Sequence, residues 1–127
     1  MNKLSNILKI TFHFLNIITI FLYLFPGSIL GWLFYKDLTK QPQLTDDFIS
    51  ISSNHFYFFF VLSIIGILSY SKHKKFNLLI KYLLLLSVIL ELSHLLIPQR
   101  KFELGDLFGN ILGFMVAIII YKIWKKV

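Results

Sequence analysis

Long apolar segments alternate with shorter polar ones along the whole chain. The four main apolar segments cover residues 7–25, 55–70, 76–97 and 107–124. A helix of about 20 apolar residues crosses the hydrocarbon of a bilayer, and these segments have lengths close to that value. The pattern predicts an all-α fold: a bundle of four transmembrane helices in an integral membrane protein, with residues 1–127 forming a single domain.

The first apolar segment follows a short basic stretch and resembles a signal sequence. No small-residue cleavage site follows it, so we expect an uncleaved membrane anchor. Pro26 and Gly27 interrupt the apolar run, as expected from residues that disfavour a continuous helix. The apolar stretch from Ser28 to Tyr35 beyond them suits an interfacial or partly inserted piece. One longer, kinked first helix that reaches Phe34 is the alternative.

Residues 36–54 are the most polar stretch and are predicted to form an external loop. Ser52, Ser53 and Asn54 at its end offer choices for the N-cap of the second helix, because their side chains can accept hydrogen bonds from free backbone N–H groups. The two later connections are short. Short connections predict antiparallel neighbours.

Composition supports the membrane class. Hydrophobic residues make up 57% of the 127 residues, aromatic residues make up 17%, and the mean hydropathy is +0.74. Soluble domains rarely reach such values. Cysteine is absent, which excludes disulfides and thiolate metal sites.

The net charge of +7 is distributed unevenly along the chain. Nine of the thirteen basic residues fall in three groups at segment ends, as in the positive-inside pattern of membrane proteins. We therefore expect a protein of the plasma (inner) membrane with both termini cytoplasmic, and membrane lipids, not nucleic acid, as partners. The three groups are Lys3 and Lys9; Lys72, Lys74, Lys75 and Lys81; and Lys122, Lys125 and Lys126.

Two ionisable residues interrupt the third apolar segment. Glu91 and His94 are three residues apart and share a helix face. An ionisable group at membrane depth costs roughly 2.5 to 3.5 kcal/mol on insertion scales, so such groups normally face partners inside a bundle. Since only eight residues, 98–105, connect this segment to the next, we expect Glu91, His94, Arg100 and Asp106 to meet at the outer end of the bundle.

The last apolar segment places polar and small residues on one face. Asp106, Asn110 and Gly113 are spaced by four and three residues, which is the helical repeat. Asp106 also suits the N-terminus of this helix, where it could act as a cap. Gly109 and Gly113 form a small-xxx-small pair that lets another helix approach closely. We expect that neighbour to be the third predicted helix.

The motif as a whole resembles the signature of VanZ-like membrane proteins, which is roughly E-x-x-Q, then P-x-R, two acids, N and G. His94 departs from the usual Gln of the family. His55 matches a family histidine that opens the second helix, although Ile51 and Ser52 stand in place of the usual D-K before it. The matching residues are Glu91, Pro98, Arg100, Glu103, Asp106, Asn110 and Gly113. The resemblance implies a role in the cell envelope and in low-level resistance to the glycopeptide antibiotic teicoplanin, and it implies no particular reaction.

Three functions fit these residues. In the first, the protein binds an anionic lipid headgroup or a lipid-linked envelope precursor at the outer leaflet and thereby influences glycopeptide resistance or surface polymer biogenesis. Arg100 and Lys101 would hold phosphate in this reading, with His55 and Asn110 as further binding residues.

In the second, the protein is an intramembrane hydrolase or transferase. Glu91, His94 and Asp106 would be its catalytic residues, with Glu91 or His94 as the base and Arg100 stabilising developing negative charge. In the third, it is a structural or assembly subunit, and pairing of Glu91 and His94 with Arg100 only ties helix ends together.

Other polar residues receive simpler interpretations. His13 and Asn16 in the first segment are expected to be helix-contact groups. A zinc site built from His55, His94, Glu91 and Asp106 is chemically possible, because imidazole and carboxylate are competent ligands. Only one pair spaced by three residues suggests it, so we predict no metal and no cofactor. The familiar nucleotide-binding, hydrolase and metalloprotease motifs are absent from the sequence.

Overall fold

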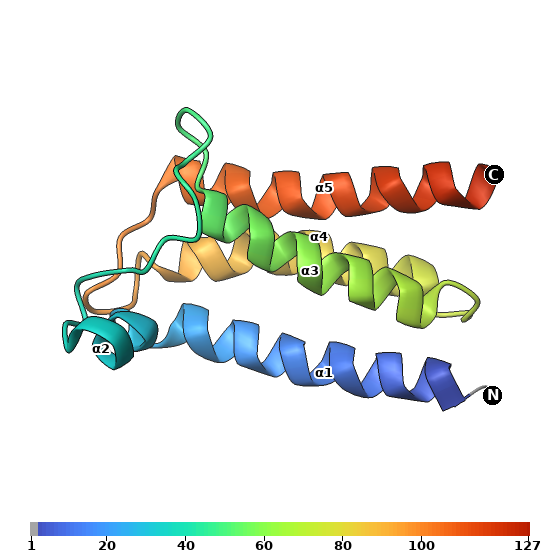
Figure 1. Ribbon diagram of the computed structural model, residues 1–127, viewed down its shortest axis with the longest axis horizontal. Coiled ribbons are helices and arrows are strands. Elements are labelled where there is room, and N and C mark those ends of the chain that lie inside the picture. The colour runs from blue at the N-terminus through green and yellow to red at the C-terminus, as the bar shows by residue number, and fades with distance from the viewer. Residues whose placement is uncertain (1–2) are drawn as a thin grey trace.

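The computed structural model describes residues 3–127, and this part of the chain is all-helical apart from its loops. Four long helices lie side by side, and the short helix α2 lies at one end of them (Figure 1). Each long helix has the length and hydropathy needed to cross a membrane, which confirms the predicted bundle. The helices are α1 (Lys3–Leu24), α2 (Ile29–Tyr35), α3 (Ser53–Tyr70), α4 (Phe76–Ser93) and α5 (Leu104–Lys126).

The bundle has two distinct ends. The terminal end carries the beginning of α1, the end of α5 and the turn between α3 and α4 (Figure 1). The loop end carries α2, the irregular segment 36–52 and the connection between α4 and α5. The start of α1 and the end of α5 therefore lie on the same side of the bundle.

A break at Gly27 separates α1 from α2. Gly27 has a φ of +81°, a left-handed conformation that favours glycine. The Ser28 side chain then caps α2 by accepting a hydrogen bond from the N–H of Gly31 at 2.9 Å. The alternative of one kinked helix reaching Phe34 is therefore wrong, because residues 25–28 are not helical.

The third long helix is shorter than predicted. It ends at Ser93, and not near Ile97, and the N–H groups of residues 94–96 bond to carbonyls three residues earlier. Pro98 explains the early end, because its ring lacks an N–H and would clash with the carbonyl of His94 in a continued helix. His94 therefore lies just after α4, in a tight turn.

The last helix begins at Leu104, earlier than the predicted residue 107. Asp106 is therefore not the N-cap. It lies in the first turn, where a carboxylate is favoured by the positive end of the helix dipole. The N-cap position is Glu103, whose side chain makes no capping hydrogen bond.

Side-chain hydrogen bonds tie the predicted external loop to α3. Asn54 donates to the carbonyl of Pro42 at 2.6 Å and accepts from the N–H of Leu44 at 3.0 Å. The N-cap of α3 is Ser52, but its side chain makes no capping bond. The carboxylate of Asp47 accepts from the Ser53 N–H at 3.0 Å instead, so the loop supplies the acceptor that this helix end needs.

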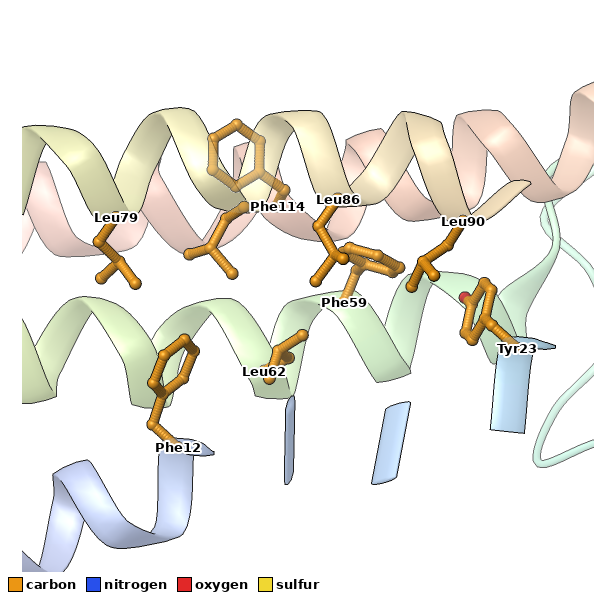
Figure 2. Close-up of a cluster of buried hydrophobic side chains, with 9 residues drawn as sticks. Phe12, Tyr23, Phe59, Leu62, Leu79, Leu86, Leu90 and Phe114 are labelled. Atoms are coloured by element: carbon orange, nitrogen blue, oxygen red, sulfur yellow. The ribbon is translucent and has the colours of Figure 1, made fainter. Parts of the chain in front are cut away.

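The apolar core runs along the bundle between the four long helices, and most of its residues belong to α1, α3 and α4. Figure 2 shows Leu86 and Leu90 of α4 pointing toward Phe59 of α3, with Phe12 and Tyr23 reaching in from α1. Many other large apolar side chains are exposed, among them those of Ile10, Phe14 and Ile17 on α1. An apolar outer surface of this kind is what a bilayer requires.

Gly109 and Gly113 pack against α3, so the prediction that they face the third predicted helix, α4, is wrong. A Cβ on Gly109 would lie 2.6 Å from the carbonyl oxygen of Ser52, and one on Gly113 would overlap the carbonyl oxygen of Phe56. The pair does let two backbones approach closely, as such pairs do. The sequence pattern indicates that a neighbour exists but does not indicate which one.

Two isolated hydrogen bonds join helices nearer the terminal end. His13 of α1 lies 3.0 Å from the hydroxyl of Tyr70 on α3. The Tyr82 hydroxyl of α4 donates to the side-chain oxygen of Asn16 on α1 at 2.8 Å. These bonds confirm that His13 and Asn16 are helix-contact residues.

Candidate functional site

The predicted polar residues meet inside the loop end of the bundle. His55, Glu91, His94 and Asn110 are all buried, and Asp106 is half-buried beside them. These residues come from α3, α4 with the turn after it, and α5. We call this set, together with Tyr23 of α1, the loop-end cluster: Tyr23, His55, Glu91, His94, Asp106 and Asn110.

Glu91 is the most deeply buried acid of the cluster, with 0% of its surface exposed. Its Oε1 lies 3.2 Å from His94 Nδ1 and accepts a hydrogen bond from the Glu103 N–H at 3.2 Å. Its Oε2 is buried and has no hydrogen-bond partner in the described part of the chain. Buried polar atoms are nearly always paired, so this oxygen is an exception that needs a reason.

His94 is held on both sides of its ring. Nε2 donates to the backbone carbonyl of Tyr23 at 3.0 Å, since a carbonyl can only accept. The ring also stacks on the Tyr23 side chain, with 5.8 Å between centroids and an interplanar angle of 20°. With Nδ1 facing Glu91, both nitrogens are engaged. His94 therefore fixes the Glu91 carboxylate to the end of α1.

Asn110 organises the middle of the cluster. Its Nδ2 donates to the carbonyl of Ser87 at 3.0 Å, which sets the direction of the amide. Its Oδ1 then accepts from the Tyr23 hydroxyl at 2.6 Å and lies 3.2 Å from His55 Nδ1. The Tyr23 hydroxyl oxygen is 3.1 Å from the same nitrogen. Side chains of α1 and α5 thus converge on Nδ1 of His55 in α3.

His55 lies between two carboxylates. Its Nδ1 is 3.7 Å from Glu91 Oε2, and its Nε2 is 3.4 Å from Asp106 Oδ2. One ligand atom from each of His55, Glu91 and Asp106 can be chosen so that all lie within 4.8 Å of one another. These are the residues of the cluster that could hold a metal ion.

Arg100 does not pair with Glu91 or His94, although the hypothesis of a structural subunit predicted such pairing. Its Nη2 and Nε donate to the carbonyls of Leu22 and Phe25 at 2.6 and 3.1 Å, and within residues 3–127 no carboxylate lies at ion-pair distance from it. It therefore caps the end of α1. Burial lowers the pKa of the Arg100 guanidinium, an effect that nearby negative charge opposes, and arginine stays cationic at neutral pH.

Two hollows that share lining residues adjoin the cluster. The outer pocket has a volume of about 590 Å³ and is lined by His94, Arg100, Lys101, Asp106 and neighbouring loop residues. The inner cavity, of about 50 Å³, reaches Tyr23 and His55 and shares His94 and Arg100 with the outer pocket. Lys101 is exposed at the outer pocket.

Tyr23 is the member of the cluster that sequence reasoning missed. It lies in an apolar segment where a tyrosine is unremarkable, and no spacing rule links it to residues of α3 and α5. The sequence signal that could have identified it was the Tyr23 hydroxyl, a polar group one turn before Pro26. Ser87 was missed as well, and only its backbone carbonyl takes part.

Comparison of the chain with models of known protein families, with curated proteins and with solved structures gave no match. The resemblance to VanZ-like proteins therefore stays an expectation from the motif.

Proposed function

We propose that this protein is a VanZ-like, multi-pass protein of the plasma membrane that acts in the cell envelope, with its loop end on the outer side. The distribution of lysines supports this orientation. Lys72, Lys74 and Lys75 lie in the turn at the terminal end, and Lys122, Lys125 and Lys126 lie close to it at the end of α5. Such residues favour the cytoplasmic side.

We infer that the outer pocket binds the anionic headgroup of a membrane lipid or of a lipid-linked envelope precursor. The observation that carries this inference is the pair of cations at the pocket, Arg100 and Lys101. Arg100 uses two N–H groups on α1 carbonyls, and its other N–H groups have no partner within residues 3–127. A guanidinium with free donors recognises phosphate well. In the VanZ-like setting, such binding would alter the response to teicoplanin-type glycopeptides.

Native mass spectrometry of protein extracted directly from membranes tests this proposal. We expect an anionic lipid to copurify and to be lost, or strongly reduced, in Lys101→Ala. Lys122→Ala at the terminal end is the matched control, since it removes the same charge far from the pocket. Equal loss of lipid in both variants, or no copurified lipid in the unmodified protein, would reject the pocket as the binding site.

A biological test follows from the same proposal. Expression of the protein in a teicoplanin-sensitive bacterium should raise the inhibitory concentration, and Lys101→Ala should lower that increase while Lys122→Ala preserves it. An unchanged inhibitory concentration with well-expressed protein would remove the link to glycopeptides but not the headgroup site.

Hydrolysis or transfer of the bound headgroup is a second candidate function. The inner cavity of about 50 Å³ favours it, because it offers water-sized space beside His55 at the inner side of the headgroup pocket. Asp106 is half-buried at the pocket and could exchange protons with a bound group. Glu91 is fully buried and His94 has both nitrogens engaged, so these two are better suited to positioning than to direct proton transfer.

Incubation of the purified protein with anionic phospholipids and lipid-linked precursors, followed by mass spectrometry of released headgroups, tests the second candidate. Asp106→Asn should abolish release and keep lipid binding. Asp46→Asn, in the exposed loop, should leave both unchanged. Release that continues in Asp106→Asn at the rate of the unmodified protein would contradict this role.

A further inference from the structure

Three ligand-capable side chains from three helices meet in the loop-end cluster. His55 comes from α3, Glu91 from α4 and Asp106 from α5, and suitable atoms of all three lie within 4.8 Å of one another. His55 is 4% exposed and Glu91 is 0% exposed. Acidic groups near each other on a surface are common, but two members of this set are buried and one of those is an imidazole.

The hydrogen bonds around His55 determine which ring nitrogen is free. The Tyr23 hydroxyl donates its proton to Asn110 Oδ1, so both groups that face His55 Nδ1 present lone pairs to it. Nδ1 therefore carries the ring hydrogen. In a neutral imidazole this leaves Nε2 with a free lone pair, and Nε2 faces Asp106 Oδ2 at 3.4 Å.

The free Nε2 of His55 and the Oδ2 of Asp106 are thus two electron-rich atoms that face each other. Two ligands held about 2.1 Å from a tetrahedral ion lie about 3.4 Å apart, which is the separation seen here. The free His55 nitrogen and the Asp106 oxygen are therefore spaced as two donors to one cation.

Glu91 gives a second and independent argument for a cation site. Its Oε2 is buried, has no hydrogen-bond partner within residues 3–127, and lies 3.7 Å from His55 Nδ1, beyond hydrogen-bond distance. An ionised carboxylate without a partner costs several kcal/mol in such surroundings. His94 and the Glu103 N–H hold only the other oxygen. The arrangement leaves Oε2 as an oriented, unused ligand.

We propose that His55, Glu91 and Asp106 bind one divalent transition-metal ion, Zn²⁺ or Mn²⁺. One imidazole nitrogen and two carboxylates suit these ions better than Ca²⁺, which prefers six to eight oxygen ligands. Three protein ligands leave at least one coordination position for water or for a ligand oxygen. The inner cavity beside His55 provides space for it.

The surroundings of the three residues match those of metal ligands in proteins. A ligating histidine commonly donates its other ring N–H to a carbonyl or carboxylate oxygen, which fixes the tautomer. Here Asn110 Oδ1 accepts that hydrogen bond, and the Ser87 carbonyl orients Asn110 in turn. His94 orients Glu91 in the same manner. Asn110 and His94 are therefore positioning residues of the proposed site.

The test uses tag-free, full-length protein in detergent, stripped with a chelator and free of added lipid. Calorimetric titration and elemental analysis with Zn²⁺ and Mn²⁺ should give one bound ion per chain. Asp106→Asn and His55→Gln should weaken binding by at least about tenfold, the lower range seen for residues that support a metal site. Asp46→Asn in the loop and His73→Gln in the turn between α3 and α4 are matched controls and should bind as the unmodified protein does.

Thermal unfolding shows whether each variant is folded. A second measurement uses the unmodified protein, so it does not depend on the variants being folded. Pulsed electron paramagnetic resonance of the Mn²⁺-loaded unmodified protein should show coupling to one histidine nitrogen. Binding of no ion, equal affinity in folded Asp106→Asn, or a bound ion without nitrogen coupling would each overturn the proposal. In the last two cases His55 is not a metal ligand. It is instead a protonated side chain or a hydrogen-bond donor between two carboxylates.

The metal site stands apart from the headgroup proposal. Metal binding is measured without lipid, whereas copurification of lipid can be measured in the presence of a chelator. Lys101→Ala should reduce lipid binding and leave metal affinity unchanged, so failure of one proposal is distinguishable from failure of the other.

Discussion

Polar side chains are arranged differently at the two ends of the bundle. Toward the terminal end, His13 meets Tyr70 and Asn16 meets Tyr82 in separate pairs, each joining two helices. At the loop end, six side chains from four helices form one connected network that contains an unpaired carboxylate oxygen. Joining helices requires only the simple pairs. The excess of acceptors at the loop end is what the proposed cation site would use.

Removal of Glu91 should have the largest effect on stability. Glu91→Ala leaves His94 Nδ1 and the Glu103 N–H without their buried partner, and such losses cost about 3 to 5 kcal/mol. The free energy of unfolding, measured by denaturant titration in detergent, should fall by about that amount. Glu103→Ala, an exposed acid at the same end, is the control. If both variants unfold at the same denaturant concentration, the cluster does not hold the loop end together.

Close packing of α5 on α3 should be the next most sensitive feature. In Gly109→Ala the new Cβ lies 2.6 Å from a backbone oxygen, and backbone cannot rotate away as a side chain can. We expect a loss of at least about 2 kcal/mol, within the range for overpacking. Gly66→Ala is the matched control, since its Cβ meets the ring of Phe12, which can shift. A larger loss at Gly66 than at Gly109 would contradict this view of the α3–α5 contact.

A substitution of Arg100 can separate the effect of its charge from the effect of its hydrogen bonds. Arg100→Lys keeps the cation but cannot reproduce both bonds to the Leu22 and Phe25 carbonyls. Thermal unfolding should show a loss of about 1 to 2 kcal/mol, since one charged hydrogen bond is lost. Lys101→Ala, on the exposed neighbour, should change stability by less than about 0.5 kcal/mol. Equal stability of Arg100→Lys and the unmodified protein would show that Arg100 does not cap α1.

The smallest effect should come from the pairs toward the terminal end. Tyr70→Phe removes the hydroxyl that meets His13 and should cost about 0.5 to 1.5 kcal/mol, the net value of one ordinary hydrogen bond. Tyr23→Phe removes the equivalent atom from the loop-end cluster and should cost more, because two buried partners lose a bond. If Tyr70→Phe lowered the melting temperature more than Tyr23→Phe, the distinction between the two ends would be removed.

Sequence reasoning predicted the number and order of the long helices because crossing a bilayer demands length and hydropathy, which are local properties. It also selected Glu91, His94 and Asp106, because an ionisable residue beside an apolar run is costly wherever the helices pack. It could not assign the neighbour of Gly109, since helix choice depends on the shape of every face. For the same reason it missed Tyr23, whose role exists only where α1 meets α3 and α5.

Arg100 and the loop-end cluster together have a consequence for movement of α1. Five hydrogen bonds hold this end of the helix to the rest of the protein: the Tyr23 hydroxyl donates one and accepts one, the Tyr23 carbonyl accepts one, and Arg100 donates two. They involve adjacent atoms on one turn and would break together. A molecule large enough to displace this end of α1 would therefore break the polar network beneath it in the same step.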